Sequence, residues 1–415
     1  MTKLRTLTGL IVTVVLSAWA PVHADAVTDW NAVTLSCVQG PPSPPNRGGP
    51  AGLLDIALVQ AAVHDAVQAI QGRFEPYAYE NPAMRGVGSP EAAAAAAAYG
   101  MLVGLYGSDD PCLATVTDPA ATYAGDGGLQ AGAEAAAALL PLYRPTFVLP
   151  TDPFVGSNEP GQWRPTPGVT QGASTFMAHT APFAMKEPAQ FRPQPPPRLQ
   201  SWRYALDYDE VKAVGAASSS TRTPEQTELA RFWTANFFTQ WNEALRVIAD
   251  EHLSDIGDTA RLFALAGFAA ADSQISVYDA KYHYNFWRPI TAIQEGDHDG
   301  NLLTIGDPAW TPFIQTPPYP EYSSGANCLV GGLTTILQLY FGTDRFEFSV
   351  WSTAADLSVN PRTYHRFSDA AREVVEARIL QGIHFRTAED VGRRQGIRIA
   401  RWTFSKYLRP VKSMM

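Results

Sequence analysis

Apolar residues recur along most of the chain at the spacing expected of amphipathic or buried α-helices. The sequence has no long run of alternating apolar and polar residues, and no succession of strand and helix patterns. The pattern therefore predicts an all-α protein. The predicted helices cover about residues 53–70, 89–106, 129–140, 223–249, 258–284, 324–342 and 368–381.

Two of these helices begin with recognisable capping residues. Ser89 is followed by Pro90 and Glu91, and Thr223 opens the Thr-Pro-Glu-Gln sequence of a capping box. A serine or threonine oxygen caps the free N–H groups of a helix, and proline is well tolerated at the first helical position. These residues therefore mark two helix starts.

Residues 141–200 lack a helical pattern because proline recurs throughout them. The segment also carries large apolar side chains for burial, namely Trp163, Phe176, Phe183 and Phe191. We interpret it as a long, ordered segment that wraps around the helices; a disordered linker is the alternative. It separates an N-terminal helical region, residues 25–140, from a C-terminal helical region, residues 201–415.

Residues 1–24 have the features of a secretory signal peptide. Lys3 and Arg5 precede an apolar run, and Val-His-Ala at residues 22–24 has small residues in its outer positions. The run is shorter than the roughly 20 residues of a membrane-spanning helix. We therefore expect a periplasmic or secreted protein with no membrane attachment after cleavage; a retained N-terminal anchor is the alternative.

Charge and cysteine content narrow the choice of partners. The formal net charge of −9 argues against nucleic acid and anionic membranes, so a site for an anion must gather its cations locally. The three cysteines show no zinc-site spacing. In an oxidising compartment Cys37 and Cys112 would pair and leave Cys328 free, although three unpaired thiols fit the sequence equally well.

Three separated segments carry groups suited to one tetrahedral anion. In the first, Lys281 and Arg288 lie about two helical turns apart, so we expect both on one face of a helix that Pro289 ends. Two neighbouring cations repel each other unless an anion lies between them, and arginine offers a planar fork for two oxygens. Two surface cations are the alternative.

The second segment is the predicted helix start at Ser324 and Gly325. The first N–H groups of a helix and the positive end of its dipole attract anions, and Gly325 permits close approach of the backbone. The Ser324 hydroxyl would add a donor. An ordinary helix cap is the alternative.

The third segment runs from Arg378 to His384. Arg378 lies late in a predicted helix, and we expect Gly382 to end that helix and return His384 to the side of Arg378. A lone histidine is more often a core residue than a catalyst. Its position after a helix break and near an arginine favours a functional role.

The order Lys-x6-Arg-Pro, Ser-Gly at a helix start and Arg-x5-His resembles the superfamily of vanadium-dependent haloperoxidases and type 2 phosphatidic acid phosphatases (PAP2). The resemblance implies two helical bundles side by side. It implies that the anion's oxygens are neutralised by Lys281, Arg288 and Arg378. Ser324 and the Gly325 amide would donate hydrogen bonds to the same oxygens. His384 would bind the vanadium of vanadate in a haloperoxidase, or attack phosphorus in a phosphatase.

The resemblance also indicates residues around the anion. Trp287, Tyr319 and Tyr322 would shape the side on which a halide or organic substrate binds. Asn327 would lie beside the anion and donate a hydrogen bond.

The sequence departs from the family pattern at Ala326, where the family has an acid–base histidine. Such a group is typically worth about 100- to 10,000-fold in rate. Asn327 does not carry protons near neutral pH, and His283 and His365 are the candidate substitutes.

A second departure concerns the carboxylate that the family places four residues after its third-segment histidine. Ala388 stands there, so Glu389 or Asp390 would orient the His384 ring.

The leading hypothesis is a vanadium-dependent haloperoxidase-like enzyme, which holds vanadate and uses hydrogen peroxide to oxidise a halide or an organic substrate. The first alternative is an acid phosphatase that hydrolyses a phosphomonoester through a phosphohistidine and needs no cofactor. The second is an oxyanion-binding relative without turnover, which the alanine at position 326 favours. A homo-oligomer is compatible with each of them.

Overall fold

The computed structural model describes residues 25–40, 49–143, 153–219 and 221–411. Within these residues the chain forms thirteen α-helices, several short 3-10 turns and one two-stranded hairpin. The predicted all-α class is confirmed, with the hairpin as the one addition among the described residues. The expected signal peptide, residues 1–24, lies outside the described residues.

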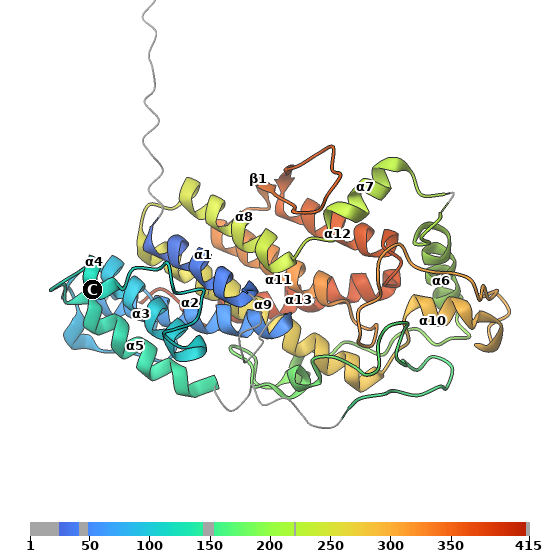
Figure 1. The fold of residues 1–415 in the computed structure, drawn as a ribbon, viewed down its shortest axis with the longest axis horizontal. Coiled ribbons are helices and arrows are strands. Elements are labelled where there is room, and N and C mark those ends of the chain that lie inside the picture. Colours follow the sequence, from blue (N-terminus) through green and yellow to red (C-terminus); the bar gives the residue numbers. More distant parts are fainter. Residues whose placement is uncertain (1–24, 41–48, 144–152, 220, 412–415) are drawn as a thin grey trace, which may run out of the picture.

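A first group of helices lies at one end of the molecule (Figure 1). Its members are α1 (Ala26–Gln39), α2 (Pro50–Gln71), α3 (Pro90–Tyr106), α4 (Pro119–Thr122) and α5 (Gly128–Tyr143). Helix α2 packs against α3 and α5. It is long and apolar enough to cross a membrane, yet it is buried inside the fold, as the core helix of this group.

A disulfide ties this group together. It joins Cys37 near the end of α1 to Cys112 in the loop after α3, and Cys328 is free and buried. Of the two arrangements that the sequence leaves open, the structure has the paired one.

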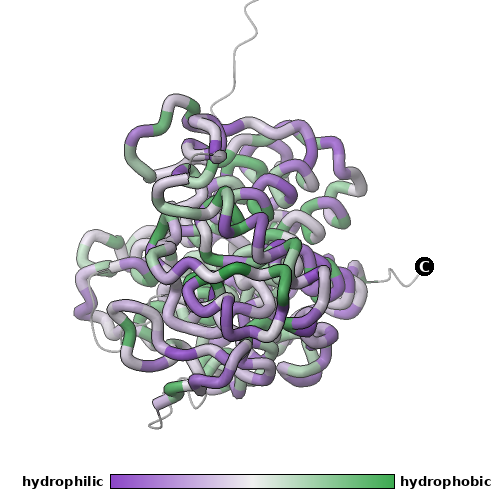
Figure 2. Tube along the Cα trace, turned by 90° about the vertical axis from the view of Figure 1, so that its right-hand side faces the viewer, coloured by the Kyte–Doolittle hydropathy of each residue, from purple (hydrophilic) through white to green (hydrophobic). Residues whose placement is uncertain are grey.

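The second group of helices contains the three segments with candidate chemistry. Its members are α6 (Trp202–Val214), α7 (Pro224–Phe232), α8 (Phe237–His252), α9 (Ile256–Tyr284), α10 (Pro289–Gln294), α11 (Gly325–Phe341), α12 (Phe367–Leu380) and α13 (Arg386–Lys406). Helix α9 is buried along most of its length and contacts α2 of the first group as well as α11 and α13 of the second. The end of the molecule that carries α6 and α10 presents a mixture of hydrophilic and hydrophobic residues (Figure 2).

Helices α11 and α13 approach each other closely because glycines line their contact. A Cβ atom at Gly392 would lie 2.5 Å from the carbonyl oxygen of Ser324, and one at Gly396 would lie 2.0 Å from that of Cys328. Both distances are too short for a side chain. The glycines therefore hold the start of α11, and Ser324 with it, against the first half of α13.

The proline-rich segment is ordered over residues 153–200 and follows an irregular path along α9, with 3-10 turns at Thr175–His179 and Pro188–Phe191. Its Trp163 and Phe183 side chains are buried, as expected of a wrapping segment. The buried carboxylate of Asp272 on α9 accepts hydrogen bonds from three consecutive backbone N–H groups of this segment, at 2.7 to 2.8 Å. The proposed division into three regions remains a prediction.

The predicted continuous helix at 223–249 is wrong, because the chain forms α7 and α8 with a break between Trp233 and Asn236. The capping box at Thr223 is present as predicted. At the break, the Asn236 side chain accepts a hydrogen bond from the N–H of Phe238 and so starts a new helix. The aromatic residues of this stretch suit both helices, so periodicity alone did not reveal the break.

The hairpin of β1 (Arg345–Val350) and β2 (Arg362–Arg366) was not predicted. Its strands are too short for a clear alternation, and only Phe348, Val350 and Tyr364 are buried. The helix predicted from residue 368 is present as α12, which starts one residue earlier at Phe367, and the Ser368 hydroxyl donates to Asp344 at 2.7 Å.

We expect Asp272→Asn to lower the free energy of unfolding by about 2–4 kcal/mol, because buried N–H groups of the wrapping segment lose their acceptor. Urea unfolding measures the loss, and limited proteolysis within residues 181–200 reports local release. Asp209→Asn, on the exposed surface of α6, is the matched control. Equal stability of the two variants would contradict the anchoring role of Asp272.

Candidate functional site

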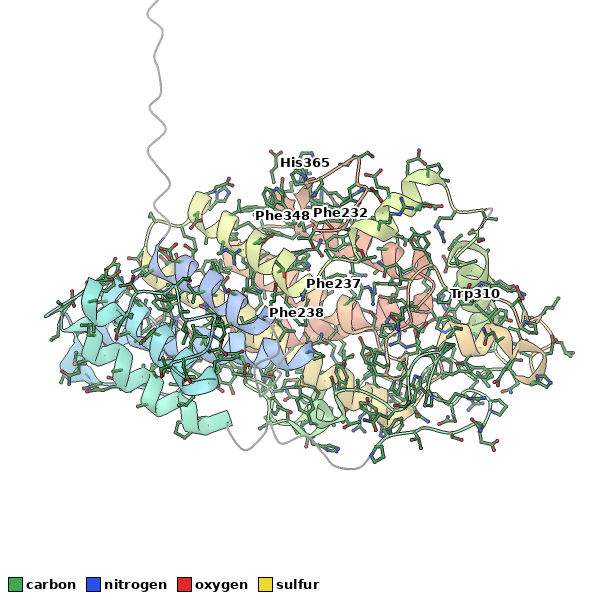
Figure 3. The ribbon with its side chains drawn as sticks, in the orientation of Figure 1. Phe232, Phe237, Phe238, Trp310, Phe348 and His365 are labelled. Carbon is green, nitrogen blue, oxygen red and sulfur yellow. A yellow bond between two sulfur atoms is a disulfide. The ribbon has the colours of Figure 1, made fainter. Side chains whose placement is uncertain are left out.

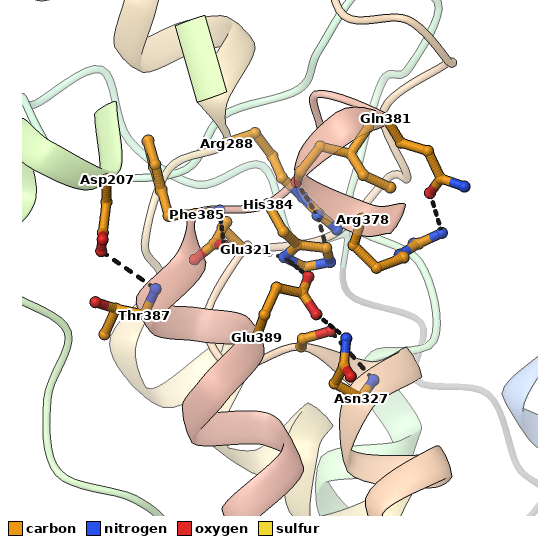
Figure 4. Close-up of polar contacts among 12 residues, drawn as sticks. Asp207, Arg288, Glu321, Asn327, Arg378, Gln381, His384, Phe385, Thr387 and Glu389 are labelled. Carbon is orange, nitrogen blue, oxygen red and sulfur yellow. Dashed lines mark hydrogen bonds and ion pairs between the residues drawn. The ribbon is translucent and has the colours of Figure 1, made fainter. Parts of the chain in front are cut away.

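The three predicted segments converge where the end of α9, the start of α11 and the turn between α12 and α13 meet (Figure 4). The side chains of Lys281, Arg288, Ser324 and His384 are at most 2% exposed. Arg378, Gly325 and Ala326 are partly exposed and mark the open side of the site. The predicted convergence is therefore present in the structure.

Lys281 lies in the last turn of α9, and its ammonium group points to the loop before α11. Its Nζ donates to the carbonyl oxygens of Pro320 at 2.9 Å and Glu321 at 2.8 Å. Burial, with Arg288 nearby, lowers the pKa of Lys281 well below its usual value. The lysine thus ties the first segment to the second.

Arg288 reaches the site by a route that the sequence analysis did not foresee. Helix α9 ends at Tyr284, and Asn285 adopts a left-handed conformation with φ of 49° that turns the chain. Arg288 directly precedes α10. Pro289 is the first residue of that helix and does not end α9. The prediction that Lys281 and Arg288 lie on one face of the same helix is therefore wrong, although both side chains reach one site.

The guanidinium of Arg288 makes three polar contacts in the site. It donates to the carbonyl oxygens of Tyr319 at 2.8 Å and Ile383 at 2.9 Å, and its Nη1 lies 3.1 Å from Nε2 of His384. Arginine has no acceptor atom, so Nε2 of His384 accepts this bond and carries no proton. The other terminal nitrogen of Arg288, Nη2, has no hydrogen-bond partner among the described residues.

His384 follows Gly382, whose φ of 77° turns the chain after α12 as predicted. With Nε2 unprotonated, Nδ1 carries the ring proton and donates to Oε1 of Glu321 at 2.9 Å. Burial, and then the nearby Arg288, lower the pKa of His384 well below its usual value. The ring is therefore neutral and fixed in one tautomer.

Glu321 is the functional residue that the sequence analysis missed. Its Oε1 also accepts the backbone N–H of Phe385 at 3.0 Å. Glu389 and Asp390 were the predicted partners of the His384 ring. Glu389 lies 3.7 Å from Nδ1, farther than Glu321, and Asp390 forms no ion pair with the ring among the described residues. The expected orienting role of these two residues passes to Glu321, which stands three positions before Ser324 in the second segment.

Glu389 lies near the same Nδ1 atom of His384 as Glu321, and its carboxylate accepts a hydrogen bond from the side chain of Asn327. Burial raises the pKa of Glu389 to about 7 and that of Glu321 to about 8. Asn327 thus contacts a site carboxyl.

Arg378 lies in the last turn of α12, and its Nη1 donates to Oε1 of Gln381 at 2.7 Å. Its guanidinium carbon lies 5.7 Å from the ring centre of Phe237. The Nε–H group has no partner within the described part of the chain. Arg378 therefore has a donor to spare on the partly exposed side of the site.

Ser324 caps α11, and its hydroxyl accepts a hydrogen bond from the N–H of Asn327 at 3.3 Å. As at every helix start, the N–H groups of Gly325 and Ala326 have no intrahelical partner. The second segment is therefore a helix start whose first N–H groups have no partner within the helix, and their contact with an anion remains a prediction.

The aromatic residues predicted around the anion separate into two places. The Tyr319 ring centre lies 5.2 Å from Nζ of Lys281 and 5.0 Å from the guanidinium carbon of Arg288, so Tyr319 faces both cations. Trp287 and Tyr322 belong instead to a second apolar core cluster. Of these three aromatic residues, the structure places Tyr319 alone against the site's cations.

Neither histidine considered as a substitute at position 326 reaches the site. His283 is exposed near the end of α9. His365 lies on the hairpin, where its ring pairs with Glu347 and its side chain is 78% exposed (Figure 3). Neither candidate replaces the histidine missing at position 326, because both residues lie on outward-facing surfaces.

The donor set fits a tetrahedral oxyanion. Three cationic side chains meet two carboxyl groups, so the fully ionised cluster keeps an excess positive charge. Two buried guanidinium N–H groups have no protein partner in the described structure, and the first backbone N–H groups of α11 have no partner within that helix. Buried donors are nearly always bonded, so these groups indicate where a bound anion places its oxygens.

Parts of the chain are similar in sequence to known proteins. Residues 261–413 match the family model described as the VCPO second helical-bundle domain. The chain is also 29% identical over 235 residues to the vanadium chloroperoxidase of Curvularia inaequalis. That alignment covers 48% of this chain and 36% of the fungal protein, so the chain matches only about a third of that relative's length.

Solved structures of bacterial enzymes share the fold. The first bacterial vanadium-dependent iodoperoxidase superposes with a TM-score of 0.76 at 24% identity, over 94% of this chain and 96% of that one. A holo-type bacterial vanadium-dependent chloroperoxidase gives 0.73 at 17% identity, over 92% of this chain and 97% of that one. At these identities the likeness shows the fold alone, which includes the expected helical bundles.

We expect sulfate to bind more tightly as the pH falls from 9 to 6, by about tenfold or more. Because burial raises the pKa values of Glu321 and Glu389, both carboxyls gain protons over this range, and the site becomes more positive. Sulfate keeps its charge throughout, so calorimetric titration isolates the protein's contribution. Glu389→Gln should flatten the profile, and a pH-independent affinity in the parent protein would contradict this account.

Proposed function

We propose, from the relationship of this chain to the vanadium haloperoxidases, that it binds vanadate at the convergent site and uses hydrogen peroxide to oxidise a halide or an organic substrate. The observation that carries the proposal is the pair of guanidinium N–H groups, on Arg288 and Arg378, that have no partner in the part of the chain that the structure describes and lie near the imidazole of His384. Such a pocket offers charge, hydrogen bonds and one imidazole ligand to the same small anion.

The cations and helix-start donors would hold the oxygens of the anion. Lys281 and Arg288 are positioned by backbone carbonyls and have little freedom to move. Preorganised charges in a water-poor site stabilise developing charge more strongly than flexible groups in water. Bound vanadate would supply the activation of peroxide, and the protein supplies charge and position.

His384 would be the protein ligand of the metal. Glu321 holds the proton on Nδ1, so Nε2 keeps its lone pair, which now accepts a hydrogen bond from Arg288 and would bind the metal in its place. A carboxylate behind the imidazole also raises the ring's basicity as a ligand. Glu321 is therefore a positioning residue for His384.

The same arrangement supports an acid phosphatase as the second candidate. An unprotonated Nε2 backed by a carboxylate on Nδ1 is suited to attack phosphorus. A third candidate, an oxyanion-binding relative without turnover, is supported by Ala326 and by the surface positions of His283 and His365.

We also propose that the protein works outside the cytosol, in the periplasm or the medium. The Cys37–Cys112 disulfide supports this, because such bonds persist mainly in oxidising compartments.

The deciding experiment is vanadate uptake by the purified protein, followed by three assays. Vanadate-dependent oxidation of bromide or iodide by hydrogen peroxide supports the haloperoxidase. Hydrolysis of a chromogenic phosphomonoester that vanadate inhibits supports the phosphatase. Stoichiometric vanadate binding with neither activity supports the binding protein, and no uptake would refute the proposed cofactor.

We expect Arg378→Ala to weaken vanadate binding by about 10- to 100-fold, because a charged hydrogen-bond donor is removed from a dry site. Equilibrium dialysis or vanadium NMR measures the affinity directly. Arg372→Ala is the matched control on the same helix, because that arginine is exposed and pairs with Asp369. Equal affinities in both variants would rule Arg378 out of the site.

We expect Ala326→His to raise the turnover rate of whichever activity is present by about tenfold or more, because it restores an acid–base group. The variant should leave vanadate affinity within a few-fold of the parent. An unchanged rate, combined with intact binding, would show that another residue already transfers the proton.

We expect Glu321→Gln to weaken vanadate binding by about tenfold or more, because a neutral amide behind the His384 ring raises its basicity less than a carboxylate does. Nitrogen NMR of the histidine ring in the apo-protein is an independent readout: the Nδ1 resonance should shift, while Nε2 stays unprotonated beside Arg288. Glu389→Gln serves as the comparison, since Glu389 lies farther from Nδ1. An unchanged Nδ1 resonance together with unchanged vanadate affinity would contradict the positioning role.

A further inference from the structure

We propose that a cavity on the outer face of α13 is a second binding site, which takes a small organic anion with an apolar body. The cavity has a volume of about 600 Å³ and lies between the end of the wrapping segment, the start of α6 and α13. This inference does not depend on the proposed oxidation chemistry.

The cavity concentrates positive charge in an acidic protein. Its charged lining residues are Arg198, Arg203, Arg394 and Arg398, and its described lining contains no aspartate or glutamate. The chain as a whole carries a net charge of −9. Four guanidinium groups around one hollow repel each other, and an anion between them would relieve that repulsion.

Most of these arginines lack a compensating carboxylate. Arg203 lies 3.4 Å from Asp207, which offsets part of its charge. Among the described residues, no ion pair is formed by Arg394 or Arg398, which lie one helical turn apart on α13. Like charges at this spacing destabilise a helix slightly, so the pair has no evident structural benefit.

Two of the guanidinium groups are held in place by neutral partners. The Arg398 guanidinium carbon lies 5.2 Å from the ring centre of Phe191, and Nε of Arg203 donates to the Thr387 hydroxyl at 2.9 Å. Holding a charged side chain in advance lowers the entropy cost of binding. The cavity is therefore partly preorganised for an anionic group.

The rest of the lining is suited to an apolar body. Phe191, Val391 and prolines of the wrapping segment form the walls. Tyr322 also lines the cavity, and its hydroxyl donates to the carbonyl oxygen of Gln194 at 2.7 Å, so the ring itself faces the ligand space without a spare proton. An aromatic or aliphatic carboxylate, sulfonate or phosphate ester matches this combination of guanidinium forks and apolar walls.

The cavity is separate from the oxyanion site but shares a wall with it. Gln395 lines the cavity, accepts a hydrogen bond from the Ser323 hydroxyl at 2.7 Å, and donates to Ser276 at 2.8 Å. Ser323 precedes Ser324, which caps α11. None of the cationic residues of the oxyanion site lines this cavity.

The test uses naphthalene-2-sulfonate and 2-naphthoate as anionic probes and 2-naphthol as the neutral analogue, titrated calorimetrically into the full protein. We expect one saturable site for at least one anion and no saturable binding of 2-naphthol. The double variant Arg394→Ala, Arg398→Ala should weaken binding by about tenfold or more, because two charged contacts are lost. Arg401→Ala, which is exposed on α13 but does not line the cavity, should stay within about twofold.

Saturating tungstate, a stable tetrahedral anion, distinguishes the two sites. If the probe still binds when tungstate fills the oxyanion site, and the double variant still binds tungstate normally, the second site is supported. Displacement of the probe by tungstate would overturn the proposal. So would the absence of saturable binding, or equal binding by the parent and the double variant.

Discussion

The candidate site depends on the contacts that Glu321 makes in two directions. Its backbone carbonyl accepts a hydrogen bond from Lys281 on α9, and its carboxylate accepts one from His384 after α12. Charged groups buried away from water are costly unless they are paired, and here each pairing joins elements far apart in the sequence. One residue of the loop before α11 therefore fixes the relative positions of a cation and an imidazole.

The surrounding fold keeps those contacts dry and rigid. Helix α9 is buried along most of its length, and the wrapping segment is anchored to it through Asp272. This arrangement leaves Arg378, Tyr319 and Ala326 as the partly exposed side of the centre. The inner donors are preorganised, whereas the side chains on the open side are partly accessible to solvent.

The sequence was enough to predict the class of fold and the residues that converge, because helical periodicity and residue chemistry are local properties. The sequence did not reveal how the Arg288 side chain reaches the site, because its path depends on the left-handed turn at Asn285. It also missed Glu321, whose partner lies 63 positions away and is brought near only by tertiary packing. The break before α8 was hidden for a related reason, since a single side-chain cap at Asn236 decides it.

The close glycine contacts between α11 and α13 have a mechanical consequence. Where two backbones touch at Gly392 and Gly396, a side chain can be added only by separating the helices. The position of Ser324 at the start of α11 therefore depends on the main chain of both helices. A substitution at either glycine would displace one segment of the site without altering any of its charged side chains.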